Sequence, residues 1–179
     1  IQRALPAVDD QREMIQRVFA RLKQASGRSP KGWLGPALAE TQDTVDWLHE
    51  AGFEFVADWV LDDQPVDLRT KKGTMVGLPY TQELNDLSMQ LIQGHRATEY
   101  ADRAIDEFDQ LIKDAADGSS RIMCFTIHPY IMGVPHRAKH IRRILEHVCN
   151  RPDAHVWTGE QILDWYISVR PPSGWPPAI

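Results

Sequence analysis

A histidine at position 128 stands where an apolar run ends and a loop begins. Residues 122–127 are rich in side chains that favour β-strands, which predicts a strand buried on both faces, as in a parallel sheet covered by helices. Catalytic side chains gather at the carboxyl ends of such strands. An imidazole there can give or take a proton near neutral pH. His128 is therefore a candidate general acid, although its position also suits a histidine that only closes a structural hydrogen bond.

An acidic residue and an indole follow a second predicted strand, at residues 53–57. Acid–base catalysis by a histidine is favoured by a carboxylate that orients the ring. Asp58 could fix the tautomer of His128, and Trp59 and Tyr130 could pack on a flat or cyclic substrate. Further polar side chains could line the same rim or simply face solvent in surface loops. They are Asp62, Asp63, Glu83, Asn85 and Asp86.

Two further histidines stand four residues apart on a predicted helix. His136 and His140 have a spacing that can hold a metal, but no Glu follows His136, so the zincin pattern is absent. We interpret them as surface residues and assign no metal ligand in this chain. Arg137, near the start of the same helix, could instead hold an anion.

Strands and helices alternate along the chain and must position these side chains. This rhythm predicts an α/β fold with a parallel sheet and right-handed crossovers. The polar stretch at residues 62–73 is interpreted as a long loop. Five strands are too few for an eight-stranded barrel, which leaves a small open sheet or the later part of a larger barrel. The predicted helices cover about residues 8–25, 41–52, 98–118, 136–148 and 158–169, and the strands cover 31–34, 53–57, 75–78, 122–127 and 155–157.

The composition is that of an ordinary globular protein of one domain. The chain has 179 residues, of which 42% are hydrophobic and 25% are charged. Its formal net charge of -5 argues against a nucleic-acid or membrane-surface partner. No stretch approaches the roughly 20 apolar residues of a membrane span. Cys124 and Cys149 are expected to be buried free thiols, which fits a reducing, cytoplasmic location.

Four motifs in fixed order resemble the polysaccharide deacetylase (NodB-homology) superfamily. They are GWLGP at residues 32–36, ADWVLDDQP at 57–65, LPYTQELND at 78–86 and IHPYIMGVPHR at 127–137. The branch that they resemble includes the metal-independent allantoinases and cyclic-imide hydrolases. The order and separation of the motifs match that family over about residues 12–166.

The resemblance implies a distorted (β/α) barrel with seven strands, mostly parallel and alternating with helices. Residues 1–170 would form its C-terminal part with the early strands missing, and residues 171–179 would form a Pro-rich tail. The family's Asp-Asp and His-x-x-x-His motifs would lie upstream, since Asp9 and Asp10 are interpreted as helix-capping residues. The cofactor would be zinc if those upstream ligands exist, or none. We expect either a homo-oligomer or association with the missing N-terminal half.

The resemblance also implies roles for individual residues. His128 matches the late catalytic histidine that protonates the leaving group. Asp58 and Trp59 match an Asp–Trp pair in which the carboxylate tunes the histidine and the indole walls the pocket. Trp33 falls where relatives place an arginine or an aromatic residue, and Thr126 replaces a common Leu. These two departures argue against a typical chitin or peptidoglycan deacetylase. The expected substrate-binding residues are Trp33, Trp59, Glu83, Asn85 and Tyr130.

Three functional hypotheses follow from these residues. The first is a hydrolase of non-peptide carbon–nitrogen bonds, acting by N-deacetylation or cyclic amide opening on a small-molecule or saccharide amide. The second is a non-catalytic fragment or subunit that needs a partner chain, because an open sheet edge would expose unpaired backbone. The third is a carbohydrate-binding module with Trp33, Trp59 and Tyr130 as stacking platforms.

Overall fold

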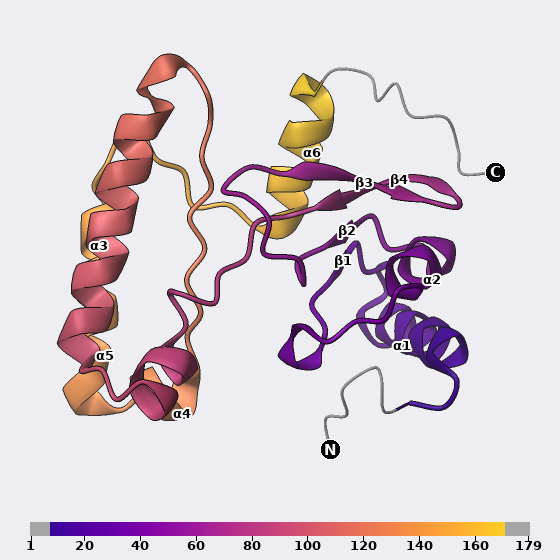
Figure 1. The fold of residues 1–179 in the computed structure, drawn as a ribbon, viewed down its shortest axis with the longest axis horizontal. Helices are drawn as coiled ribbons and strands as arrows, with labels where there is room; N and C mark the ends of the chain where they lie inside the picture. Colours follow the sequence, from indigo (N-terminus) through magenta and orange to yellow (C-terminus); the bar gives the residue numbers. More distant parts are fainter. Residues whose placement is uncertain (1–7, 171–179) are drawn as a thin grey trace. The chain divides into compact units, whose positions relative to one another are not determined.

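The computed structural model describes residues 8–170 of the chain (Figure 1). These residues divide into two compact units, the first containing residues 8–78 and 157–170 and the second containing residues 79–156. Each unit buries its own apolar side chains and so has a core of its own. The tail predicted at residues 171–179 lies outside the described residues.

The first unit is built on a four-stranded sheet with the order β1-β2-β4-β3. β1 (Gly32–Trp33) pairs in parallel with β2 (Phe55–Val56), and β2 pairs in parallel with β4 (Gly73–Gly77). β3 (Val66–Thr70) runs antiparallel to β4 and forms one edge of the sheet. A mixed α/β fold in which parallel pairing dominates is therefore confirmed for this chain.

The long polar loop predicted at residues 62–73 is wrong, because most of it belongs to a β-hairpin. β3 and β4 pair along their whole lengths, joined by a two-residue turn. Leu68 and Thr70 are buried, whereas Arg69 between them is exposed. This alternation is the pattern of a half-buried strand, but the many charged residues around it concealed the pattern.

Helices cover both faces of this sheet (Figure 1). α1 (Gln11–Ser26) and α2 (Thr44–Ala51) pack on one face, and α6 (Gly159–Val169) packs on the other. Successive strand residues point to opposite faces, so Val56 joins the α1–α2 cluster and Phe55 the α6 cluster. The buried members are Ile15, Val45, Leu48, Phe53, Val56, Leu68 and Met75 on the first face and Val76, Leu78 and Leu163 on the second.

Capping residues explain where two of these helices begin. The Asp10 carboxylate accepts the Glu13 N–H at 2.8 Å, which confirms the predicted capping role for Asp10. At α6, Thr158 Oγ1 accepts the Gln161 N–H at 3.3 Å, and Gln161 Oε1 accepts the Thr158 N–H at 2.9 Å. This reciprocal arrangement is the predicted capping box.

Two details of the predicted helices are wrong. α2 begins after Asp43 rather than at Thr41, because the Thr41 N–H donates to Thr44 Oγ1 at 2.8 Å in a turn that precedes the helix. Leu22, expected on the apolar face of α1, is exposed. It lies in the second half of the helix.

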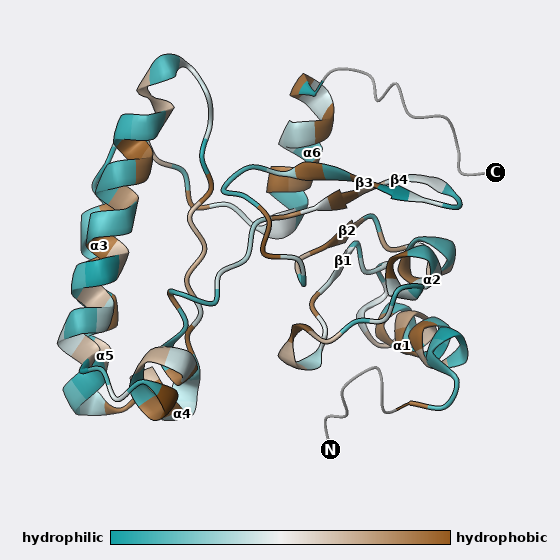
Figure 2. Ribbon diagram, viewed as in Figure 1, coloured by the Kyte–Doolittle hydropathy of each residue, from teal (hydrophilic) through white to brown (hydrophobic). Residues whose placement is uncertain are grey.

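The second unit is mainly helical. α3 (Ala97–Asp114) and α5 (Pro135–Cys149) lie side by side (Figure 1). α3 carries both hydrophilic and hydrophobic residues along its length, as expected for an amphipathic helix (Figure 2). A π-helix, η3 (Leu87–Ile92), and a short helix, α4 (Pro129–Met132), complete the core. Among residues 8–170, no helix is both long and apolar enough to cross a membrane. The buried core residues are Leu84, Met89, Tyr100, Ala101, Ala104, Ile131, Met132 and Ile144.

The buried strand predicted at residues 122–127 is wrong in the described residues. The segment carries a single parallel bridge, between Asn85 and Thr126, and Ile127 is exposed. An apolar run becomes a sheet strand only where a neighbouring strand supplies a hydrogen-bond ladder, and among the described residues this segment has only the one bridge. The strand predicted at residues 155–157 is also wrong, since these residues are exposed and belong to none of the described sheet strands.

Both cysteines are free thiols. Cys124 is half-buried, but Cys149 is exposed at the end of α5. The prediction of a buried thiol is therefore wrong for Cys149, which lies where the helix leaves the core.

Candidate active site

His128 lies between an extended segment and a helix. Its backbone is extended, with φ -100° and ψ 120°, and it forms the N-cap of α4. Its carbonyl accepts the N–H groups of Ile131 and Met132 at 2.9 and 3.0 Å. Pro129 suits the first helical position, where no N–H partner is needed. The local sequence therefore fixes the backbone of His128 at a sharp change of direction.

A buried carboxylate holds the imidazole. Asp86 is fully buried, its Oδ1 lies 2.6 Å from His128 Nδ1, and its Oδ2 accepts the His128 backbone N–H at 2.7 Å. A carboxylate only accepts hydrogen bonds, so Nδ1 carries the hydrogen. The other ring nitrogen, Nε2, is then the position that can take or deliver a proton.

The bridge between two extended segments places Asp86. The Asp86 N–H donates to the Thr126 carbonyl at 3.3 Å, and the Thr126 N–H donates to the Leu84 carbonyl at 2.8 Å. Asn85 Oδ1 accepts the N–H of Leu87 at 3.0 Å, which starts η3. The side chain of Asn85 thus shapes the turn that carries Asp86.

Two tyrosines support the same bridge. The hydroxyl of the fully buried Tyr100 donates to the Thr126 carbonyl at 2.9 Å. Burial raises the pKa of Tyr100, with the charge of Asp86 adding to the rise, so the hydroxyl keeps the hydrogen that it donates. Thr126 Oγ1 in turn donates to the Tyr80 hydroxyl at 2.9 Å. The polar groups beneath His128 therefore form a connected network.

The outer side of His128 is open to solvent. Its side chain is 31% exposed, and the ring of Tyr130 meets it edge to face with centroids 5.6 Å apart. Tyr130 itself is 66% exposed, so it can form a wall for a flat ligand. Glu83 is exposed and pairs with Arg103 at 3.5 Å.

A second cluster of predicted residues lies in the first unit, where β1 and β2 end. Asp58 is 6% exposed, and its Oδ1 accepts the Gly35 N–H at 2.6 Å. A Cβ on Gly35 would lie 2.7 Å from Asp58 Oδ2, so glycine is needed there for this approach. The carboxyl ends of the two parallel strands thereby bring Gly35 and Asp58 together.

Glu40, which the sequence did not single out, belongs to this second cluster. It follows a 3-10 turn, η2 (Pro36–Leu38), and accepts a short hydrogen bond from the Trp59 indole N–H. Burial raises the pKa of Glu40 to about 7, and the neighbouring Asp58 adds to the rise. Burial also raises the pKa of Asp58, while the Gly35 N–H, Glu40 and Trp33 lower it.

The predicted residues thus fall into two groups, one in each unit. His128, Asn85 and Tyr130 surround Asp86 in the second unit, and Trp33, Asp58 and Trp59 surround Glu40 in the first. The carboxylate that bonds His128 is Asp86, whereas the role expected for Asp58 towards this histidine stays a prediction. Asp86 was visible in the sequence only as one of five polar candidates, and no sequence signal marked Glu40.

Metal-ligand sets were sought among the described residues. Residues 8–170 contain no group of three or more His, Cys, Asp or Glu side chains that could hold a metal ion. His136 and His140, on α5, therefore have no third such ligand within that range. Arg137 donates to the Ile131 carbonyl at 3.2 Å.

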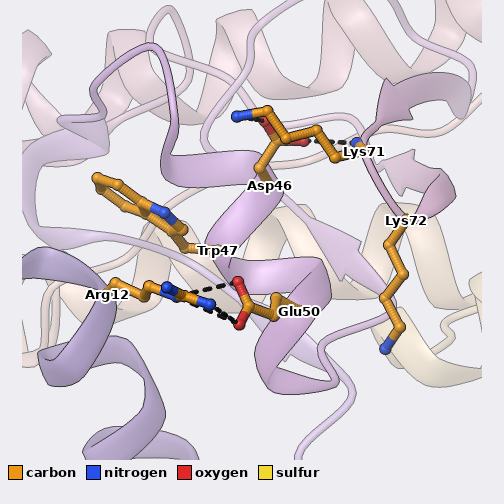
Figure 3. Close-up of a pocket in the computed structure, with 6 residues that line it drawn as sticks. All are labelled: Arg12, Asp46, Trp47, Glu50, Lys71 and Lys72. Carbon is orange, nitrogen blue, oxygen red and sulfur yellow. Dashed lines mark hydrogen bonds and ion pairs between the residues drawn. The ribbon is translucent and has the colours of Figure 1, made fainter. Parts of the chain in front are cut away.

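A pocket elsewhere in the first unit is lined mainly by charged residues that pair with one another (Figure 3). Arg12 pairs with Glu50, Lys71 bonds Asp46 at 3.0 Å, and Trp47 lies between these pairs (Figure 3). Lys72, the third cation of the lining, bonds the His49 carbonyl at 3.2 Å, so this pocket is better explained as the contact between α1, α2 and the hairpin turn.

Comparisons with known proteins extend this geometry. The chain is 26% identical over 175 residues to a protein of Schizosaccharomyces pombe (strain 972 / ATCC 24843) named "Putative polysaccharide deacetylase", covering 89% of this chain and 55% of that protein. The chain resembles the polysaccharide deacetylase superfamily. It matches no protein-family model, and it spans about half the length of the curated relative.

Solved structures show the same fold. A probable polysaccharide deacetylase from Pseudomonas aeruginosa PAO1 superposes with a TM-score of 0.81 at 22% identity, covering 90% of this chain and 54% of that one. PuuE allantoinase superposes with a TM-score of 0.84 at 21% identity, covering 96% and 57%. The resemblance predicted from the four motifs is confirmed, and the fold is consistent with part of a (β/α) barrel.

Proposed function

We propose that this chain is the later part of a hydrolase that splits non-peptide carbon–nitrogen bonds, by N-deacetylation or by opening a cyclic amide. The observation that carries the proposal is the His128–Asp86 pair, in which a buried carboxylate orients an imidazole whose side chain is 31% exposed. The likeness to polysaccharide deacetylases and to an allantoinase supports the bond type. In this proposal, the complete domain is a distorted seven-stranded (β/α) barrel.

His128 acts as the general acid when the tetrahedral intermediate collapses. The carbon–nitrogen bond breaks, its electron pair goes to the leaving nitrogen, and that nitrogen takes the proton from Nε2 of the imidazolium. Asp86 stabilises the imidazolium and fixes the ring, since Nδ1 stays hydrogen-bonded throughout. A positioned acid of this kind contributes about 10²–10⁴-fold in rate.

The family resemblance implies zinc in some relatives, but residues 8–170 do not supply its ligand set, so no step here is routed through a metal. An attacking water supplies the oxygen of the product carboxyl group. Asp58, which matches the Asp of the family's Asp–Trp pair, is proposed as a second catalytic residue.

The substrate in this proposal is a small-molecule or saccharide amide. Trp59 and Tyr130 are exposed aromatic side chains that can stack on a ring, and Trp33, Glu83 and Asn85 complete the proposed binding set. We further propose that the chain works as a homo-oligomer or together with the remaining part of its barrel. Exposed apolar residues favour such an association, among them Leu34, Val60 and Leu61.

The test measures hydrolysis by the complete protein. N-acetylated sugar oligomers and five-membered cyclic amides serve as the two substrate classes, and release of acetate or ring opening is the readout. We expect His128→Gln to lose at least about 100-fold in turnover, whereas His136→Gln on exposed α5 keeps the native rate. Native turnover by a folded His128→Gln protein would exclude the acid role. Binding of sugar without turnover would instead favour the carbohydrate-binding alternative.

A further inference from the structure

Glu40 and Asp58 form a pair of carboxyl groups within hydrogen-bonding reach of each other. One oxygen of each is already bonded, because Asp58 Oδ1 accepts the Gly35 N–H and Glu40 Oε2 accepts the Trp59 indole N–H. The other two oxygens, Asp58 Oδ2 and Glu40 Oε1, are buried and have no hydrogen-bond partner among the described residues. The buried indole N–H of Trp33 likewise has no hydrogen-bond partner among the described residues, so two acceptors and one donor stay unpaired around the two carboxyl groups.

A single proton resolves this arrangement. Two ionised carboxylates in contact repel each other, and a buried acceptor without a donor costs roughly 1–3 kcal/mol in stability. A proton on one carboxyl turns the two unpartnered oxygens into the two ends of one hydrogen bond. Burial of both groups favours the neutral form in the same direction.

The surroundings of the pair decide which carboxyl keeps the proton. Gly35 N–H and the Trp33 indole lower the pKa of Asp58, while the Trp59 indole lowers that of Glu40. Each carboxyl group also changes the pKa of the other. Burial, the largest influence, raises the pKa of both. The net result leaves Glu40 as the proton carrier, with a pKa of about 7.

We propose that Glu40 and Asp58 share one proton and that the protonated pair positions the indole of Trp59. Trp59 is 40% exposed, and its N–H is held by the same carboxyl that carries the proton. Loss of the proton leaves two carboxylates side by side, and Glu40 then moves towards solvent and draws Trp59 with it. This inference goes beyond the proposed function and holds whether or not the protein is a hydrolase.

The test follows the indole N–H resonances of the full chain by NMR as a function of pH, with Trp59→Phe giving the assignment. We expect the Trp59 resonance to shift with a midpoint near pH 7, within about one unit, while the Trp47 resonance serves as an internal reference. Glu40→Gln keeps a donor for Asp58 but cannot ionise, so the shift should vanish. Asp58→Asn removes the neighbouring charge, so the midpoint should move to lower pH.

Glu54→Gln is the matched control, because Glu54 is exposed and directly precedes β2. In this variant the Trp59 resonance should titrate as in the native protein. A Trp59 resonance that does not change between about pH 5 and pH 9, or that titrates equally in Glu40→Gln, would overturn the proposal. If Glu40→Gln fails to fold, infrared difference spectra of the native protein decide. A protonated carboxyl band that disappears as the pH rises through about 7 supports the shared proton, and its absence refutes it.

Discussion

Asp86 accepts two hydrogen bonds from one residue, the backbone N–H and the ring Nδ1–H of His128, at 2.7 and 2.6 Å. The carboxylate thus fixes the direction of the chain and the orientation of the ring at the same time. Because Asp86 is fully buried and His128 is partly exposed, the pair connects the core of the second unit to its surface.

Asp86→Asn should therefore reduce activity more than its small change in shape suggests. The amide oxygen can accept one of the two N–H groups, but the amide NH₂ then faces the other donor. We expect turnover to fall by about 10²–10⁴-fold and the free energy of unfolding to fall by about 2 kcal/mol. Urea unfolding and steady-state kinetics measure the two effects separately.

His128→Gln is the matching variant for this prediction. It removes the acid, but the amide NH₂ of the glutamine can still donate a hydrogen bond to Asp86. It should lose turnover with a smaller loss of stability than Asp86→Asn. Equal activity of Asp86→Asn and the native protein would show that the carboxylate has no part in orienting a catalytic ring.

Local signals predicted the helices better than the strands. Asp10, Gly27 and the Thr158–Gln161 box mark helix ends through side chains and backbone within a few residues, so the sequence shows them directly. β4 overlaps the strand predicted at residues 75–78, but β3 was not predicted because its charges resemble those of a surface loop. The run at 122–127 was read as a full strand because an apolar sequence does not reveal how long its neighbour is.

The site was predicted in part for a related reason. His128 and Asp58 stand at the ends of apolar runs, a position that the sequence shows. Asp86 and Glu40 become important only through contacts with residues far away in the sequence, since Asp86 and His128 are 42 positions apart. A pairing of this kind depends on the register between segments, which one sequence alone does not reveal.

Tyr100→Phe tests the buried network beneath the histidine. The Tyr100 hydroxyl donates to the Thr126 carbonyl at 2.9 Å, and its removal leaves that acceptor with one donor fewer in a dry environment. We expect the free energy of unfolding to fall by about 1 kcal/mol. Tyr130→Phe, at an exposed position, should change it by less than about 0.5 kcal/mol; equal effects would mean that the buried bond contributes nothing.

His49 should make the first unit sensitive to acid. Its Nδ1–H donates to Thr70 Oγ1 at 2.6 Å, since the Thr70 hydroxyl itself donates to the Gly73 carbonyl. Burial, and then the charge of Lys72, lower the pKa of His49 from 6.5. The unfolded chain therefore binds the proton first as the pH falls, so stability present above about pH 6.5 is lost as the pH drops through the folded-state pKa.

The measurement compares unfolding free energies of the native protein and His49→Gln between about pH 8 and pH 5. As the pH falls, the free energy of unfolding should decrease more for the native protein than for His49→Gln, because glutamine does not take up a proton. His136→Gln on exposed α5 is the control. A difference that stays constant across this range would contradict the assignment.

The capping box of α6 should be worth about 1 kcal/mol. Thr158→Ala removes the oxygen that accepts the Gln161 N–H, leaving one N–H at the helix start unsatisfied. Thr158→Ser keeps that oxygen and should stay within about 0.5 kcal/mol of the native protein. If the alanine and serine variants are equally stable in thermal or urea unfolding, the side-chain oxygen is not what starts the helix.

Gly159→Ala should destabilise the first unit, although alanine normally favours a helix by up to about 1 kcal/mol over glycine. A Cβ at this position would lie 2.8 Å from Phe55 Cζ and 3.2 Å from Phe55 Cε2. The ring cannot retreat freely, because a Cβ on Gly32 would also lie only 2.0 Å from Phe55 Cζ, which shows how tightly the backbone of β1 holds it. We expect a loss of about 1–3 kcal/mol in the free energy of unfolding from overpacking.

In a Phe55→Leu background the clashing ring atoms are gone, so Gly159→Ala should become neutral or stabilising. A double-mutant cycle measures this coupling, and additive effects of the two substitutions would show that Phe55 does not require a glycine at the start of α6.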